Sequence, residues 1–345
     1  MPDPIHILMT GAGAPGAPGI IKCLLQDSRI RLTVADADQN ATGKYIHGNF
    51  VQIPKATDPV FAPLLLSICK KKGVHIVLPL VTKELLPLAR HKHAFEAEGV
   101  KVLVSSEKSI EIANNKSACY TFLQKQGIAV PKFHVAKTTE EFIAAAAELG
   151  YPENSFCFKP SFSNGSRGFR IVDDSINEAN QLFQQKPYNV YITYAQILKI
   201  LSAQPFPELL VSEYLPKEEY SVDCIARHGE TIVAVPRLRS KMVNGISVQG
   251  QFVPDERIIG YCRKIIAAIN LHGNIGIQVK LSASNEPMLL EVNPRVQGTI
   301  VAGLGAGINL PVMAVLQEFG FQKEPQDLNI GWGRKFSRYW TEVFY

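Results

Sequence analysis

The sequence has 345 residues, of which 46% are hydrophobic and 19% are charged, and its formal net charge is +5 at pH 7. This length allows two or three compact units with real cores, and the composition is that of an ordinary globular protein. The Lys and Arg residues are scattered rather than grouped, which argues against a nucleic-acid-binding surface. No apolar stretch approaches the ~20 residues of a membrane-spanning helix, so we expect no membrane segment.

Cysteine usage and the first residues indicate a cytoplasmic protein. The six cysteines are far apart and show no CxxC or Cys/His metal spacing, so we expect free thiols in a reducing compartment. The chain begins MPDPIHILMTG, without the basic region and long apolar run of a signal peptide.

The first predicted unit is a strand, a glycine-rich turn and a helix, the order of a Rossmann-type unit. The strand covers residues 5–9, the turn is TGAGAPGAPG, and the next strand, residues 31–35, is followed by Asp36. An acidic residue about twenty residues past such a turn is typical of a dinucleotide site. Pro15 and Pro18, however, have no N–H group to offer a pyrophosphate. A tight turn that packs the helix on a parallel sheet, or a contact to another ligand, is the alternative.

Further strand–helix steps continue this unit. They are a helix at 59–72, a strand at 75–80, a helix at 83–97 and a strand at 100–104. Glu84 follows the strand at 75–80, and ligands of open α/β sheets bind at the carboxyl ends of strands. Glu84 is therefore a candidate substrate contact, although an acidic residue at a helix start can also simply compensate the helix dipole.

The second half mixes parallel and antiparallel patterns, which predicts α/β in front and α+β behind. Predicted helices cover 109–126, 138–149, 174–185, 191–203, 260–270 and 303–319. Predicted strands cover 155–159, 169–172, 209–214, 220–227 and 231–237, with a loop at 239–250 before further strand, and the tail 335–344 is expected to close the sheet.

The segment from 276 to 298, GIQVKLSASNEPMLLEVNPRVQG, reads as a hairpin with strands at 276–281 and 288–292. A symmetric hairpin places Gln278 opposite Glu291, and the period of two puts Asn293 on the same face. These three oxygen ligands suit magnesium when phosphate oxygens complete its shell. Arg295 follows, a planar cation suited to a phosphoryl group or a carboxylate.

Other parts of the second half carry matching chemistry. Lys116 and Lys159 precede and adjoin PSFSNGSRG, a loop between two predicted strands whose amides and hydroxyls could fold over phosphates. Arg237 and Arg239 are two apart on one strand, and two such cations repel each other unless an anion compensates them.

These motifs resemble the ATP-grasp superfamily, and within it the synthetase half-domains of the carbamoyl phosphate synthetase large subunit and their stand-alone relatives. The resemblance is carried by NK at 115–116, FKPSFSNGSRG at 158–168, SEYLPKEEYSVD at 212–223, PRLR at 236–239, and Gln278 with EVNPR at 291–295. It implies a Rossmann-like domain at 1–112 and an ATP-grasp domain at 113–345, with a lid subdomain near 116–210 and a C-terminal subdomain near 211–345.

The resemblance also implies roles for single residues. The ATP-binding set is Lys116, Lys159, Ser163, Gly165, Ser166, Gly168, Glu213, Tyr214, Leu215 and Glu219. The magnesium ligands are Gln278, Glu291 and Asn293; the catalytic candidates are Arg295, Arg237 and Arg239; and Gly11, Gly13 and Glu84 border the substrate cleft. The family usually has Gly where this chain has Glu218, so the choice between Glu218 and Glu219 for the ribose stays open.

The resemblance implies a ligase that uses ATP and Mg²⁺, or Mn²⁺ in its place, to activate a carboxylate as an acylphosphate for attack by an amine or a thiol. The partners are small-molecule carboxylate and amine substrates, and a homodimer is left open. Two alternatives remain: an NAD(P)-dependent oxidoreductase built on the N-terminal glycine-rich turn, and a non-catalytic nucleotide-binding protein. Because the sequence has no glutamine-amidotransferase segment, we do not expect carbamoyl phosphate synthesis itself.

Overall fold

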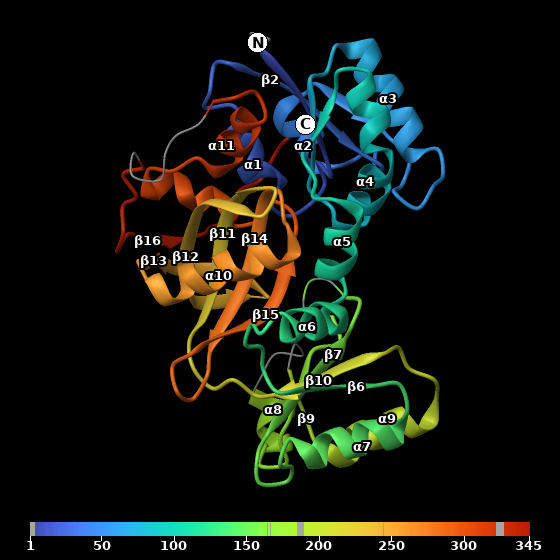
Figure 1. The fold of residues 1–345 in the computed structure, drawn as a ribbon, viewed down its shortest axis with the longest axis vertical. Helices are drawn as coiled ribbons and strands as arrows, with labels where there is room; N and C mark the ends of the chain where they lie inside the picture. Colours follow the sequence, from blue (N-terminus) through green and yellow to red (C-terminus); the bar gives the residue numbers. More distant parts are fainter. Residues whose placement is uncertain (1–3, 164, 166, 185–189, 244, 322–327) are drawn as a thin grey trace.

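The structure, a computed structural model, describes residues 4–163, 165, 167–184, 190–243, 245–321 and 328–345. Three separate sheets organise this part of the chain: two of five strands and one of six. Figure 1 shows the N-terminal unit in blue to cyan, the second unit in green to yellow at the opposite end, and the third in yellow to red beside the first.

The first sheet is parallel throughout and confirms the predicted Rossmann-like unit. Its strand order is β3-β2-β1-β4-β5. The strands are β1 (Ile5–Thr10), β2 (Ile30–Asp36), β3 (Phe50–Gln52), β4 (Ile76–Pro79) and β5 (Lys101–Val102). The helices are α1 (Ala17–Leu24), α2 (Thr42–His47), α3 (Phe61–Lys72) and α4 (Thr82–Ala97). Every residue of β1 is buried, as expected for a central strand covered on both faces.

The second sheet has the order β6-β10-β7-β8-β9 and is antiparallel except between β8 and β9. Its strands are β6 (Phe133–Ala136), β7 (Phe156–Pro160), β8 (Arg170–Val172), β9 (Tyr191–Ile192) and β10 (Leu209–Glu213). Its helices are α7 (Thr139–Glu148), α8 (Glu178–Gln184) and α9 (Tyr194–Ala203). Phe142 of α7 and Ile197 of α9 share one core cluster with Phe156 of β7, so α7 and α9 cover the same face of the sheet.

The third sheet is antiparallel, with the order β15-β14-β11-β12-β13-β16. Its strands are β11 (Glu219–Arg227), β12 (Glu230–Val243), β13 (Ile246–Phe252), β14 (Gly273–Leu281), β15 (Pro287–Asn293) and β16 (Lys335–Ser337). Helix α10 (Glu256–Ile269) packs its apolar face on this sheet, with Ile258 and Ile265 in one cluster with Val222 and Ile277. The 3₁₀ helix η1 (Ile300–Ala306) and α11 (Leu310–Gln317) follow β15.

Residues 109–126 do not form the single helix predicted from the sequence. The structure has α5 (Glu107–Asn114) and α6 (Lys116–Lys125), separated by Asn115 with φ −101° and ψ 109°. The Asn115 side chain accepts a hydrogen bond from the backbone N–H of Ala118 at 3.0 Å, which is the geometry of a helix N-cap. The break makes Lys116 the first residue of α6.

Three other predicted elements also differ. Tyr191 and Ile192, predicted as the start of a helix, pair with β8, and Thr193 caps α9 behind them. The predicted loop at 239–250 is mainly the β12–β13 hairpin, because β-pairing continues to Val243 and resumes at Ile246. The helical region predicted at 303–319 divides into η1 and α11.

The first and third units share one hydrophobic core. A single cluster contains Ile7 of β1 and Ile20 of α1 together with Val235 of β12, Ile300 of η1 and Val315 of α11. In the described part of the chain no single helix is long and apolar enough to cross a membrane, and η1 with α11 reaches that length only as a pair bent by 101°.

Candidate active site

The β14–β15 hairpin has the predicted register. Gln278 lies opposite Glu291, and Asn293 lies opposite Gly276, with a bulge after Gln278. The Asn293 side chain donates a hydrogen bond from Nδ2 to Oε1 of Glu291 at 2.8 Å, so the two side chains share one face of the strand.

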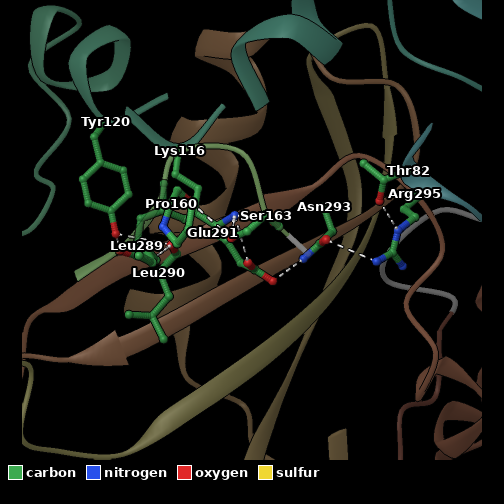
Figure 2. Close-up of polar contacts among 11 residues, drawn as sticks. Thr82, Lys116, Tyr120, Pro160, Ser163, Leu289, Leu290, Glu291, Asn293 and Arg295 are labelled. Carbon is green, nitrogen blue, oxygen red and sulfur yellow. Dashed lines mark hydrogen bonds and ion pairs between the residues drawn. The ribbon is translucent and has the colours of Figure 1, made fainter. Parts of the chain in front are cut away.

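A chain of polar contacts runs from this pair into the first unit, as Figure 2 shows. Arg295 Nη2 donates to Oδ1 of Asn293 at 3.4 Å, and Nε donates to the hydroxyl of Thr82 at 3.0 Å. Thr82 is the first residue of α4. Arg295 is therefore held between the hairpin and the amino end of a helix in the parallel sheet, and its burial lowers the pKa of the guanidinium.

Lys116 lies on the other side of Glu291. Its Nζ is 3.9 Å from Oε2 of Glu291 and donates to the backbone oxygen of Ser163 at 2.6 Å. Because the Lys116 side chain is only 8% exposed, burial lowers the pKa of its ammonium, and the Glu291 carboxylate opposes that shift. Lys116 thus connects the hairpin to the loop that follows β7.

Lys159, near the end of β7, also points at the hairpin. Its Nζ donates to the backbone oxygen of Leu290 at 2.7 Å and lies 5.7 Å from the ring centroid of Tyr120. Burial lowers the pKa of Lys159, and the nearby Glu291 and Glu219 carboxylates oppose the shift. Two lysines from separate elements therefore converge beside Glu291.

The loop after β7 contains Ser163, the residue that Lys116 contacts. Ser163 donates its hydroxyl to the backbone oxygen of Pro160 at 3.3 Å, besides accepting from Lys116. Gly165 and Gly168 have φ of 64° and 76°, values that favour glycine. Ser166, also assigned to ATP, lies outside the described residues.

The segment after β10 carries the residues that the resemblance assigns to the adenine end of ATP. The Glu213 carboxylate accepts the backbone N–H of Lys132 at 2.7 Å, and Leu215 is buried. Glu213 thus uses its side chain to join β10 to the segment before β6. The groups of this segment that remain available to a nucleotide base are its backbone and the half-buried Tyr214.

Arg237 and Arg239 each have a carboxylate of their own. Arg237 is fully buried; its Nε donates to Oδ2 of Asp223 at 2.7 Å and its Nη2 donates to the hydroxyl of Thr299 at 2.9 Å. Arg239 donates from Nη1 to the Glu219 carboxylate. Their charges are therefore compensated within the protein, without the bound anion that their spacing suggested. Glu219 is half-buried on this side, whereas Glu218 is exposed.

The N-terminal glycine-rich turn is occupied by contacts within the chain. Gly13 donates its N–H to Oδ2 of Asp36 at 2.7 Å, so the acidic residue of the dinucleotide pattern binds its own turn. A Cβ on Gly16 would lie 2.4 Å from the Cα of Gly298, so this glycine is required for close packing of α1 on the segment after Arg295. Gly11, with φ 74°, would clash with Val81 if it had a side chain.

Glu84 is buried at the start of α4, close to this turn. It accepts the hydroxyl of Thr10 at 2.6 Å and the backbone N–H of Val81 at 3.4 Å. Burial raises the pKa of the Glu84 carboxyl to about 7. Because Thr82 binds Arg295, the substrate candidates of the first unit lie next to the hairpin end of the site.

Two residues that the sequence reasoning did not select belong to this arrangement. Thr82 holds Arg295, and only the tertiary structure brings them together. Lys280 extends along β14 on the same face as Gln278, with its ammonium 4.8 Å from the ring centroid of Tyr214. The period of two beyond Gln278 is the signal that could have identified Lys280.

The donor set of the hairpin fits a hard divalent cation. Glu291 supplies a carboxylate, and Gln278 and Asn293 supply amide oxygens from the same face. Two groups already contact the Glu291 carboxylate: the ammonium of Lys116 and the side-chain amide of Asn293. A bound cation would displace one of these groups or share the carboxylate with it.

Family models match two separate parts of the chain. A model described as "ATP-grasp in the biosynthetic pathway with Ter operon" matches residues 205–332, and "PylC-like, N-terminal domain" matches residues 7–103. The carbamoyl phosphate synthase large chain of Lachnoclostridium phytofermentans (strain ATCC 700394 / DSM 18823 / ISDg) is 27% identical over 248 residues, which is 68% of this chain and 21% of that protein. The matched part of this chain thus spans about a fifth of the length of that relative.

Solved structures share the fold. The biotin carboxylase β,γ-ATP complex from Campylobacter jejuni has a TM-score of 0.70 at 15% identity, covering 96% of this chain and 74% of that one. The L-amino acid ligase from Bacillus licheniformis has a TM-score of 0.65 at 15% identity, covering 95% of this chain and 77% of that one. The Rossmann-like first sheet followed by two antiparallel-rich units is thus an architecture shared with these solved structures, and residues 205–332, most of the third unit, match an ATP-grasp family model.

Proposed function

We propose that this protein is a cytoplasmic, ATP- and Mg²⁺-dependent ligase that activates a carboxylate as an acylphosphate for capture by an amine or a thiol. The observation that carries the proposal is the line Lys116–Glu291–Asn293–Arg295, in which two cations flank a carboxylate and an amide on one strand face. Such an arrangement suits a nucleoside triphosphate whose γ-phosphate lies near Arg295.

The nucleotide would lie between the second and third sheets. Lys116 and Lys159 would bind its phosphates, with Ser163, Gly165, Ser166 and Gly168 in the loop beside them. The backbone of Glu213, Tyr214 and Leu215 would face the adenine base. Glu219, whose carboxylate acts to raise the pKa of the nearby Lys159, would take the ribose hydroxyls.

Gln278, Glu291 and Asn293 would hold the magnesium. When bound, this ion neutralises charge on the phosphate oxygens. The chain contributes the rest by positioning: Lys116 and Lys159 fix the phosphates, and Arg295 is held by Thr82 and Asn293 where the transferred phosphoryl group and the acceptor carboxylate meet.

The chemistry needs no nucleophilic side chain. A carboxylate oxygen of the substrate attacks the γ-phosphorus in line, the bond from phosphorus to the β,γ-bridging oxygen breaks, and ADP leaves. The amine or thiol then attacks the acyl carbon, phosphate leaves, and one proton is released. Arg295 is the cation that we assign to the anionic groups in these steps. Arg237 and Arg239, the other two catalytic candidates from the sequence, already pair with Asp223 and Glu219.

The substrates would enter from the first unit, beside Gly11, Gly13 and Glu84. An L-amino acid ligase among the structural neighbours supports a carboxylate and an amine as the substrate pair. The contact between Arg295 and Thr82, two residues before Glu84, supports this side for the acceptor.

An NAD(P)-dependent oxidoreductase is the alternative that the glycine-rich turn suggests. The Gly13–Asp36 hydrogen bond and the contact of Gly16 with Gly298 account for that turn without a dinucleotide. The alternative also leaves the Lys116–Arg295 line without a role.

Thermal-shift titration distinguishes these functions. We expect stabilisation by ATP with Mg²⁺ and none by NADH; the reverse result would overturn the ligase. A panel of carboxylates is then screened for ADP release, with hydroxylamine to trap an acylphosphate. ATP binding without a trapped acylphosphate for any carboxylate would indicate a non-catalytic nucleotide-binding protein.

A further inference from the structure

Lys280 is a third ammonium at the nucleotide site, at the end opposite Arg295. It follows Gln278 by two positions on β14, so its side chain leaves the sheet on the same face. Its ammonium lies over the ring of Tyr214, 4.8 Å from the centroid, and makes no hydrogen bond to any residue that the structure describes. A half-buried ammonium has three N–H donors, so this one has donors to offer a bound ligand.

Glu219 lies directly across the sheet from Lys280. The two residues are register partners in the β11–β14 pair, and the Glu219 carboxylate favours the charged form of Lys280, whose pKa burial lowers. Arg239 donates to Oε1 of Glu219, and no other described residue hydrogen-bonds this carboxylate. An acceptor on Glu219 and a donor on Lys280 thus face the same space from neighbouring strands.

A ribose hydroxyl is chemically complementary to the pair of Glu219 and Lys280. A hydroxyl donates one hydrogen bond and accepts others, so it can donate to a carboxylate and accept from an ammonium at the same time. A phosphate oxygen can only accept, and it would be repelled by Glu219. The nearby Tyr214, on the segment assigned to the base, places this pair at the nucleoside end rather than at the γ-phosphate.

Resting on the proposed function, we propose that Lys280 is a specificity-determining residue that donates a hydrogen bond to a ribose hydroxyl of the nucleotide, opposite Glu219. Lys280 thereby favours ribonucleotides over deoxyribonucleotides. The methylene stem of Lys280 provides an apolar surface beside the base, which a neutral side chain of equal length retains.

The test combines a protein change with a ligand change. Dissociation constants of ATP, 2′-deoxy-ATP and 3′-deoxy-ATP with Mg²⁺ are measured by calorimetry for the wild type, Lys280→Met and Lys280→Gln. Lys264→Met, at an exposed position of α10, is the matched control. Circular dichroism and the unfolding midpoint confirm that each variant is folded.

We expect Lys280→Met and Lys280→Gln to weaken ATP binding about tenfold or more, since a hydrogen bond from a charged donor is lost. For one of the two deoxynucleotides, which lacks the hydroxyl that Lys280 contacts, the loss should be less than about threefold. Lys264→Met should bind all three nucleotides as the wild type does.

Two results overturn the inference alone: unchanged ATP binding by both folded variants, or an equal loss for all three nucleotides, which indicates a phosphate or base contact. Failure of the wild type to bind any of the three nucleotides instead overturns the proposed function together with this inference.

Discussion

Arg295 donates its Nε–H to the hydroxyl of Thr82 at 3.0 Å, across 213 residues of sequence. Thr82 begins α4 in the first unit, whereas Arg295 follows the hairpin of the third. The cation assigned to the transferred phosphoryl group therefore depends on the parallel sheet for its orientation. In the proposed function, the first unit would therefore not only border the substrate but also orient the cation that meets the transferred phosphoryl group.

Thr82→Val should lower turnover about tenfold or more while leaving ATP affinity unchanged. Valine keeps the shape of threonine but cannot accept from the charged guanidinium, and a hydrogen bond to a charged group contributes about 1.5–3 kcal/mol. Turnover is measured as ADP release with a carboxylate identified by the screen, and ATP affinity by calorimetry. Thr82→Ser, which retains the hydroxyl, should recover most of the activity; equal losses in both variants would contradict the positioning role.

Glu291→Gln should reduce ADP formation by at least about 100-fold without unfolding the protein. The change removes the only carboxylate among the three proposed magnesium ligands and a charge beside Lys116, and loss of one preorganised stabilising group costs about 3–4 kcal/mol. Arg295→Ala should have a similar effect. Glu286→Gln, in the exposed turn of the same hairpin, serves as the control. Near-normal turnover of Glu291→Gln with a true substrate would refute the metal assignment.

Glu84 should make the fold less stable as pH rises. Its carboxyl ionises near pH 4.5 in the unfolded chain, whereas burial raises the pKa to about 7 in the folded protein. The unfolded chain therefore releases the proton first, and the folded state loses stability between about pH 4.5 and pH 7, by about 3 kcal/mol in total.

Glu84→Gln removes this titration and retains an oxygen for the Thr10 hydroxyl. Urea unfolding at pH 5 and pH 8 should show a smaller difference between the two pH values for the variant than for the wild type. Parallel pH profiles of the two proteins would show that Glu84 does not titrate in this range.

Gly16→Ala should destabilise the protein by about 1–3 kcal/mol, because the new methyl group would lie 2.4 Å from the Cα of Gly298 and the backbones would have to separate. Gly260→Ala, within α10, is the matched control, since a Cβ there meets no atom within 4 Å. Alanine at an unhindered helix position should raise the free energy of unfolding by about 0.5–1 kcal/mol. Both changes are measured by chemical denaturation. Equal effects would mean that the contact of α1 with the segment after β15 is not tight.

The sequence predicts the strand pairing of the hairpin well because the relevant information is local. A polar turn flanked by two alternating strands defines which residues pair, and the structure has Gln278 opposite Glu291 as expected. The same applies to Lys159, which a short apolar strand places next to a glycine-containing loop. The sequence does not predict the break at Asn115, because the residues on both sides favour a helix. What ends one helix and starts the next is the hydrogen bond from the backbone N–H of Ala118 to the Asn115 side chain.

The sequence by itself determined the parallel first unit, the order of the motifs and the face on which Glu291 and Asn293 lie, since periodicity and turn chemistry act over a few residues. Only the tertiary structure decided the partners of the charged groups. It pairs Arg237 with Asp223 and Arg239 with Glu219, binds Arg295 to Thr82, and places Lys280 over Tyr214. These partners lie 14 to 213 residues apart. Their contacts follow from how sheets pack and how buried charges find compensation, which no local pattern encodes.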